Sequence, residues 1–130
     1  MKDKIEVGEY VRVNNDNRNC IGIGKAIRLV NESVYVNMNN KYNLSVCFQI
    51  NNIVKHSKQL IDLTKIGDIV NGHLVIDKYE DVDEYGNDFW CLIIEDDSLL
   101  NRSIREEDIK TILTKESYMA NCYKVGGKDE

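Results

Sequence analysis

The sequence lacks several features that would indicate a function directly. It has no proline and is rich in Asn, Ile and Lys, which indicates an AT-rich genome and says nothing about the fold. No apolar run approaches the roughly 18 residues of a membrane-spanning helix. The charged N-terminus is followed by no apolar segment typical of a secretory signal, so we expect a cytoplasmic protein.

Metal-binding and catalytic patterns are also missing. The four cysteines are far apart, form no C-x-x-C pair and have only His56 and His73 as possible co-ligands, so zinc and other cofactors are not expected. We expect buried, reduced thiols, because the sequence indicates a reducing compartment. No nucleophile–base pair surrounds His56, which we interpret as structural, and we therefore predict that the protein is not an enzyme.

The sequence has too little positive charge for a general nucleic-acid binder. Its net charge is −5, which disfavours wrapping of a phosphate backbone and favours a partner with a basic surface. The alternative is that the charge only keeps the protein soluble. The stretch Ile21–Lys25 resembles a phosphate loop superficially, but it lacks the required spacing and a following helix pattern.

One phrase occurs twice in the chain. Residues 7–11 read VGEYV, and residues 66–70, which lie 59 positions later, read IGDIV. Similar endings follow at residues 52–57 and 108–113. Such self-similarity predicts two copies of one module of about 60 residues, each marginal alone and stabilised by a shared interface.

Short alternating segments separated by turns predict a mainly β fold made of two fused SH3-like barrels. The first module is predicted over residues 1–56, a packed connector over 57–64, the second module over 65–113, and a short helix and tail over 114–130. Within residues 20–30, Ile21, Ile23, Ile27 and Leu29 share one parity, which predicts that their face is half-buried.

The end of the chain has the pattern of a capped helix. Thr114 is predicted as the N-cap of a helix over residues 115–121, with Ser117 at its third position. Tyr118 and Cys122 are spaced to dock on a barrel.

The second half contains a strongly acidic stretch. Between residues 77 and 97, nine Asp and Glu residues accompany a single base, Lys78. Carboxylates on a hairpin there can imitate nucleic-acid phosphates and occupy a basic groove, with aromatic side chains as anchors. The alternative is a solvated hairpin whose charges protect a sheet edge. The predicted protein-binding residues are Tyr79, Glu80, Asp81, Asp83, Glu84, Tyr85, Asp88, Trp90, Asp96 and Asp97.

Several phrases resemble a family of small uncharacterised proteins encoded by phages and prophages of clostridia and related Gram-positive bacteria. These are residues 53–63 and 66–72 in the middle, 5–12 at the start, and 112–116 and 122–125 at the end. Residues 14–50 and 73–105 carry no such phrase. The resemblance implies a phage or mobile-element origin and a cytoplasmic location in the host bacterial cell. Proteins of this kind include inhibitors of bacterial immune systems.

These observations lead to three functional hypotheses. The first is a non-catalytic counter-defence inhibitor, similar to an anti-CRISPR protein, that binds a host immune protein with a basic groove through the acidic hairpin. The second is a binder of small nucleotide signals in a cleft between modules or between subunits of a homodimer. The third, disfavoured by charge, is an accessory regulator associated with nucleic acid. No membrane partner is expected.

Overall fold

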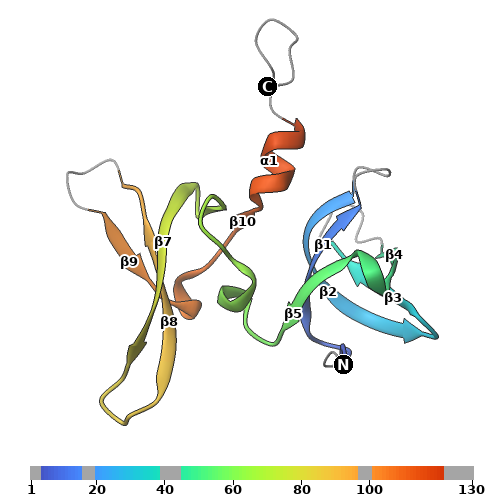
Figure 1. Ribbon diagram of the computed structural model, residues 1–130, viewed down its shortest axis with the longest axis horizontal. Helices are drawn as coiled ribbons and strands as arrows, with labels where there is room; N and C mark the ends of the chain where they lie inside the picture. Colours follow the sequence, from blue (N-terminus) through green and yellow to red (C-terminus); the bar gives the residue numbers. More distant parts are fainter. Residues whose placement is uncertain (1–3, 16–19, 39–44, 97–100, 122–130) are drawn as a thin grey trace, which may run out of the picture.

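The computed structural model describes residues 4–15, 20–38, 45–96 and 101–121 of the chain. Its strands form two five-stranded antiparallel sheets, and one short helix follows them near the end of the chain (Figure 1). The mainly β class and the short C-terminal helix are thus confirmed. The first sheet contains β1 (Tyr10–Asn15), β2 (Cys20–Val30), β3 (Ser33–Asn37), β4 (Ser45–Gln49) and β5 (Ile53–Ser57). The second contains β6 (Ile69–Val70), β7 (His73–Val82), β8 (Asp88–Ile94), β9 (Arg102–Ile104) and β10 (Ile112–Leu113).

The two sheets have the same strand order. The first runs β4-β3-β2-β1-β5, and the second, read in the same sense, runs β9-β8-β7-β6-β10. In each, four strands follow one another by antiparallel pairing and the fifth returns to the outer side of the first. This correspondence agrees with a repeated module, whose exact bounds stay a prediction.

The doubled phrase forms the same turn twice. Gly8 and Gly67 have φ of 98° and 101°, a left-handed region that glycine enters without steric cost. The N–H of Gly8 donates to the Ala26 carbonyl at 2.8 Å, and the N–H of Gly67 donates to the Val75 carbonyl at 3.0 Å. Each glycine therefore starts its module by joining the turn to the second strand.

The long strand β2 buries the face opposite to the predicted one. Ala26 is buried, whereas Ile27 is 45% exposed and Leu29 is also exposed. An added Cβ on Gly24 would lie 2.5 Å from a Val36 side-chain carbon, so β3 covers the glycine side of the strand. Ile21 and Ile23 are half-buried as predicted, but the prediction is wrong for Ile27 and Leu29, because close packing on glycine, which an apolar pattern does not register, selects the inner face.

Neither sheet closes into the small barrel that we expected. In the described part of the chain, the end strands β4 and β5 share no ladder, and neither do β9 and β10. Between β4 and β5 the chain makes a 3₁₀ turn, Ile50–Asn52, in which the Ile53 N–H donates to the Ile50 carbonyl. The backbone is thus hydrogen-bonded locally at the point where closure would require pairing across the sheet.

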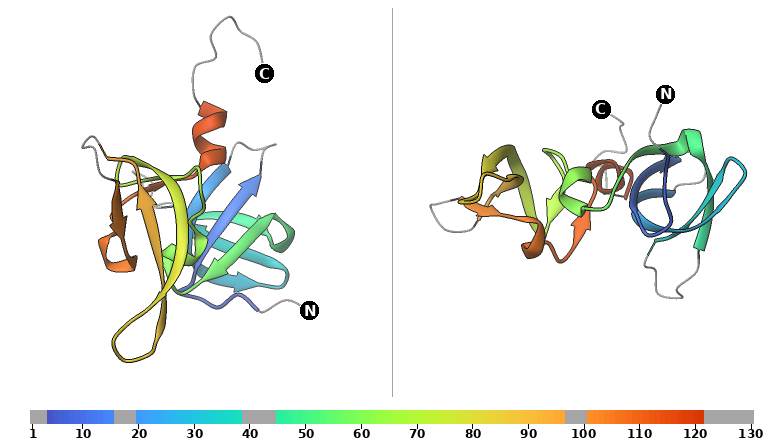
Figure 2. Two further views of the ribbon diagram at one scale, coloured as in Figure 1. Left: turned by 60° about the vertical axis from the view of Figure 1, so that its left-hand side comes forward. Right: turned by 90° about the horizontal axis from the view of Figure 1, so that it is seen from below.

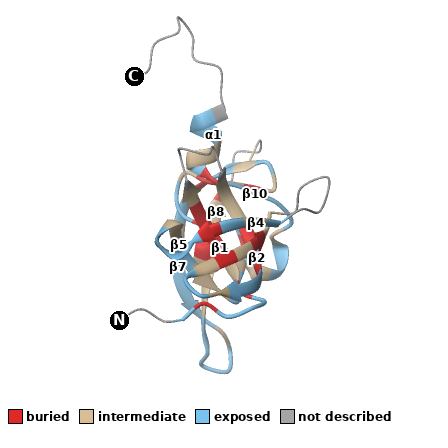
Figure 3. Cartoon of the chain, turned by 90° about the vertical axis from the view of Figure 1, so that its right-hand side faces the viewer, coloured by how far each residue is buried: buried red, intermediate tan, exposed pale blue. Residues whose placement is uncertain are grey.

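Each sheet has its own core, and Figure 3 colours the buried residues red. The first buries Ile5, Val11, Val13, Ala26, Val34, Val36 and Phe48. The second buries Ile61, Val70, Val75, Leu92, Ile94 and Ile104. Ile61 comes from the connector, where Leu60–Leu63 forms a 3₁₀ turn with Ile61 and Leu63 buried. Ile61 therefore belongs to the second core, Leu63 is buried as well, and the bounds of the connector stay a prediction.

The helix α1 (Lys115–Asn121) begins where the capping pattern predicts. The Ser117 N–H donates to the Thr114 hydroxyl oxygen at 3.2 Å. Tyr118, however, is 47% exposed, so the prediction that it docks on a barrel is wrong. Polar contacts of Glu116, described below, hold the helix in place instead. Cys122 lies outside the described residues.

The structure describes the side chains of two cysteines, Cys47 and Cys91. Cys47 and Cys91 are both free thiols, and Cys91 is buried in β8 as expected. Cys47 is exposed because β4 alternates, directing its neighbour Phe48 into the core. The side chain of Cys20 lies outside the described residues.

Candidate functional site

The acidic hairpin, residues 79–91, is a two-stranded ribbon. Pairing of β7 with β8 runs from Tyr79 opposite Cys91 to Val82 opposite Asp88. Strand β6 pairs only with the start of β7, and β9 pairs only with the end of β8. The hairpin therefore continues beyond the neighbouring strands, and its tip extends away from the rest of the chain (Figures 1 and 2).

Most of the predicted site residues are exposed on this ribbon. Those with exposed side chains are Tyr79, Glu80, Asp81, Glu84, Tyr85 and Asp88. Tyr85, at the tip, is 80% exposed, which is the largest value among the described apolar and aromatic side chains. The ribbon thus presents four carboxylates and a tip aromatic to solvent.

Asp83 has a structural role that composition did not reveal. Its Oδ1 accepts hydrogen bonds from the backbone N–H groups of Tyr85 and Asn87, both at 2.9 Å. The N–H of Asn87, followed by that of Tyr85, lowers the pKa of Asp83. This carboxylate closes the hairpin turn, so its negative charge is directed inward to the backbone.

Two of the predicted aromatic anchors are engaged within the protein. Trp90 is half-buried against the second core, and the Lys78 Nζ lies 5.0 Å from its ring centroid. The Tyr79 hydroxyl is 3.1 Å from the Ser103 Oγ on β9. Tyr85 is the predicted aromatic that remains open at the tip.

Two arginines that we did not predict moderate the acidic surface. The Arg105 guanidinium lies 4.0 Å from the Phe89 ring centroid, and the Arg102 Nε lies 3.9 Å from an oxygen of half-buried Asp96. Both arginines belong to a segment that the sequence shows only as polar and irregular. Asp97, the last predicted site residue, lies outside the described residues.

The doubled phrase also places an equivalent acid in each module. Glu9 accepts from the Glu6 N–H at 3.0 Å, and Asp68 accepts from the Lys65 N–H at 2.9 Å. Glu9 also contacts the His56 Nδ1 at 2.8 Å, and the backbone and His56 contacts outweigh burial to lower the pKa of Glu9. His56 is therefore a partner of Glu9 within the first module, and its interpretation as structural stays a prediction.

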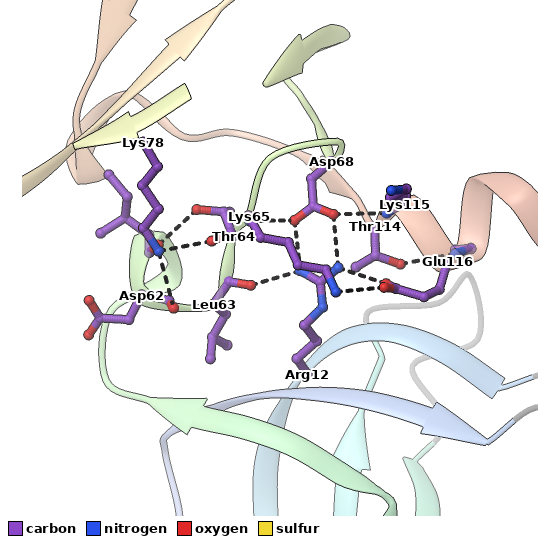
Figure 4. A network of polar contacts seen from close by, with 12 residues as sticks. Arg12, Asp62, Leu63, Thr64, Lys65, Asp68, Lys78, Thr114, Lys115 and Glu116 are labelled. Atoms are coloured by element: carbon purple, nitrogen blue, oxygen red, sulfur yellow. Dashed lines mark hydrogen bonds and ion pairs between the residues drawn. The ribbon is translucent and has the colours of Figure 1, made fainter. Parts of the chain in front are cut away.

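Asp68 instead joins the two modules through Arg12 (Figure 4). Arg12, on β1, is buried and donates to both carboxylate oxygens of Asp68 at 2.7 and 2.8 Å. It also donates to the Leu63 carbonyl and to Glu116 of α1, each at 2.7 Å. One guanidinium thus links the first sheet, the connector, the second sheet and the helix, and we call this arrangement the Arg12 latch.

The charged groups of the latch stabilise one another in their ionised forms. Burial disfavours the charged form of Arg12, but hydrogen bonds to Asp68 and Glu116 outweigh it and raise the pKa of Arg12. Burial likewise opposes ionisation of Glu116, but hydrogen bonds from Lys65 and Arg12 lower its pKa to about 2. The Lys65 Nζ lies 2.7 Å from the second Glu116 oxygen. The sequence shows only an Arg between two strand valines, because its partner Asp68 is 56 residues away.

A cleft lies beside the latch, between the modules. Its volume is 440 Å³. We call it the intermodule cleft, and it is lined by Arg12, Val54, Lys55, Asp62, Leu63, Thr64, Lys65, Ile66 and Lys78. The Lys78 Nζ donates to the Thr64 carbonyl at 2.9 Å, which fixes the side chain at the wall (Figure 4).

The described residues hold no metal cluster and no membrane-spanning helix. Within residues 4–15, 20–38, 45–96 and 101–121, no group of three or more His, Cys, Asp or Glu side chains could hold a metal ion. No helix in this part of the chain is long and apolar enough to cross a membrane.

Comparisons with protein families, with curated proteins and with solved structures find no match to this chain.

Proposed function

We propose that the chain is a non-catalytic protein-binding inhibitor of phage or prophage origin that acts on a host immune protein, in the manner of an anti-CRISPR protein. In this proposal each half is an SH3-like module with an incompletely closed barrel. The identical strand order of the two halves supports that fold assignment. The phage origin is supported by the sequence phrases described above.

The observation that carries the proposal is the exposed acidic ribbon. Glu80, Asp81, Glu84 and Asp88 are exposed around Tyr85, on a hairpin whose outer part pairs with no third strand among the described residues. A protruding set of carboxylates matches a groove that is lined by Lys and Arg to hold nucleic acid, because complementary charge accelerates encounter and determines orientation. Tyr85 supplies an aromatic contact of the kind enriched at the centre of protein interfaces.

The structure also narrows which residues would contact the partner. Asp83 is used to close the turn, Trp90 is packed on the second core, and Asp96 lies near Arg102. We therefore assign partner contact to Glu80, Asp81, Glu84, Tyr85 and Asp88. This smaller set is clustered at one end of the molecule, which suits insertion into a groove.

The test is a pull-down from bacterial lysate carrying several defence systems, with bound proteins identified by mass spectrometry. The variant Asp81→Lys/Glu84→Lys/Asp88→Lys changes three exposed residues and leaves Asp83 intact. The matched control, Glu6→Lys/Glu32→Lys/Glu107→Lys, has the same net charge but alters exposed acids outside the hairpin. We expect wild type and control to capture the same partner and the hairpin variant to lose it. Equal capture by both variants would refute the assignment to the hairpin.

The intermodule cleft favours a second candidate function, the binding of a small nucleotide signal. It brings four basic residues from both modules together, within a protein that is acidic overall. The third hypothesis, association with nucleic acid, gains no comparable support, because the protruding surface is acidic.

A further inference from the structure

The intermodule cleft holds positive charge that the protein does not fully neutralise. Arg12, Lys55, Lys65 and Lys78 line it, and of the described lining residues only Asp62 is acidic. Asp68 and Glu116 neutralise Arg12, and Glu116 also pairs with Lys65. Over the described residues, neither Lys55 nor Lys78 forms an ion pair. Asp62 accepts a hydrogen bond from the Ser57 hydroxyl.

Strand pairing forces two of these cations together. Lys55 on β5 is directly opposite Arg12 on β1, so the two side chains stand on the same face of the first sheet. Like charges in this position destabilise a sheet unless another group compensates them. Lys55 therefore adds positive charge to a face where Arg12 is already buried.

Lys78 brings a third cation from the second module. Its Nζ is held by the Thr64 carbonyl, and its side chain is half-buried. Burial, followed by the nearby charge of Lys55, lowers the pKa of Lys78, and the charges of Asp62 and Asp68 oppose this shift. An anion between Lys55 and Lys78 would relieve this repulsion and would contact both modules.

The cleft also has an apolar rim. Val54 and Ile66 line it and are exposed, with more than half of each residue accessible to solvent. Its volume of 440 Å³ is within the range of about 300–1,000 Å³ that is typical of small-molecule sites. A ligand with a charged end and a flat apolar part would match both sets of residues.

We propose that the intermodule cleft binds a nucleotide, with Lys55 and Lys78 contacting its phosphate groups and with Val54 and Ile66 contacting its base. This site gives the small-nucleotide hypothesis specific residues and does not depend on the acidic hairpin. Lysine recognises phosphate as a point charge, so the site requires a phosphate group but no particular arrangement of its oxygens.

The test measures ADP, inorganic pyrophosphate and adenosine by isothermal titration calorimetry, with thermal unfolding as a second readout. The test variant is Lys55→Glu, since Lys55 is exposed and its change spares the cores. Lys58→Glu is the matched control, because Lys58 is also exposed but lies outside the cleft. A further variant, Lys78→Gln, removes the second charge, and circular dichroism verifies that each variant is folded.

We expect ADP to bind wild type and raise its melting temperature by linkage. Lys55→Glu should weaken ADP binding by about tenfold or more, since attraction becomes repulsion, and Lys58→Glu should leave it unchanged. Pyrophosphate should bind more weakly than ADP because it has no base, and adenosine should not bind. The charge-reversed hairpin variant should retain ADP binding.

Four outcomes would overturn the proposal. In the first, neither ADP nor pyrophosphate binds up to about 1 mM. In the second, Lys55→Glu and Lys58→Glu change ADP binding equally. In the third and fourth, adenosine or pyrophosphate binds as tightly as ADP. The last would exclude a nucleotide as the ligand class. Loss of ADP binding does not affect the pull-down result, so the two functions fail independently.

Discussion

Replacing Arg12 by Met should weaken the interaction between the two modules and lower the free energy of unfolding. The change retains a long apolar side chain but removes two hydrogen bonds to Asp68, one to Glu116 and one to the Leu63 carbonyl. Asp68 is 0% exposed and keeps the backbone N–H groups of Lys65 and Lys115 as donors. Its carboxylate would then lack the cation that compensates its burial.

The expected loss of stability is large. Removing one partner of a buried ion pair costs about 3–5 kcal/mol, because the remaining charge is uncompensated. A domain of this size is typically stable by about 5–15 kcal/mol, so the change removes a large fraction of the total. At the melting temperature, this corresponds to a decrease of about 11–18 °C.

Urea unfolding of wild type and variant, extrapolated linearly to water, measures this loss. Arg28→Met is the matched control, since Arg28 is exposed and contacts only the face of Tyr35 among the interactions described, at 5.3 Å. It should lose about 1 kcal/mol or less. If Arg12→Met loses no more than Arg28→Met, the latch does not hold the modules together and our account of their interface is wrong.

Three further predictions concern pH, the hairpin turn and the thiols. Because the pKa of Glu116 falls from 4.5 to about 2 on folding, its contribution is present above pH 4.5 and is lost as the pH falls from 4.5 to about 2. After allowance for the partial exposure of Glu116, we expect the free energy of unfolding to fall by about 1–2 kcal/mol over this pH range. Urea unfolding at a series of pH values should show that Glu116→Gln lacks this decrease, and pH profiles of wild type and variant that run parallel would contradict the prediction. Asp83→Ala should lower hairpin stability, whereas Asp83→Asn, which keeps an acceptor, should lower it less; identical melting of both variants would exclude the turn contact. A thiol reagent should modify Cys47 in the native protein and Cys91 only after unfolding, as peptide mass spectrometry would show, and equal rates at both would contradict their assigned burial.

Local patterns predicted the parts of the fold that depend on local contacts. The doubled phrase predicted two copies of one module, and its glycines Gly8 and Gly67 form equivalent turns, because such a turn is determined within a few residues. The Thr114 cap was predicted for the same reason. The inner face of β2 was not predicted, since Gly24 packs against β3 and only this tertiary contact identifies the face.

The candidate site, too, was predicted only where the sequence itself determines it. Composition predicted a surface of carboxylates, and most of them are exposed on the hairpin. It did not separate Asp83, which serves the turn, from Asp81 and Asp88, which face solvent, because that distinction depends on hydrogen-bond geometry. The Arg12 latch and the cation pair of Arg12 with Lys55 were missed, since both require knowledge of how distant segments meet.

The central claim, that the acidic hairpin binds a basic partner, is tested most directly by association kinetics with the captured protein. We would measure the association rate constant of wild type, the hairpin variant Asp81→Lys/Glu84→Lys/Asp88→Lys and the control Glu6→Lys/Glu32→Lys/Glu107→Lys across a salt series. The account predicts that the wild-type rate falls as salt rises, because exposed charges are screened within about 8 Å at physiological ionic strength. It also predicts that the hairpin variant associates far more slowly than the control at low salt. A wild-type rate that is independent of salt, or equal rates for the two variants, would contradict the claim.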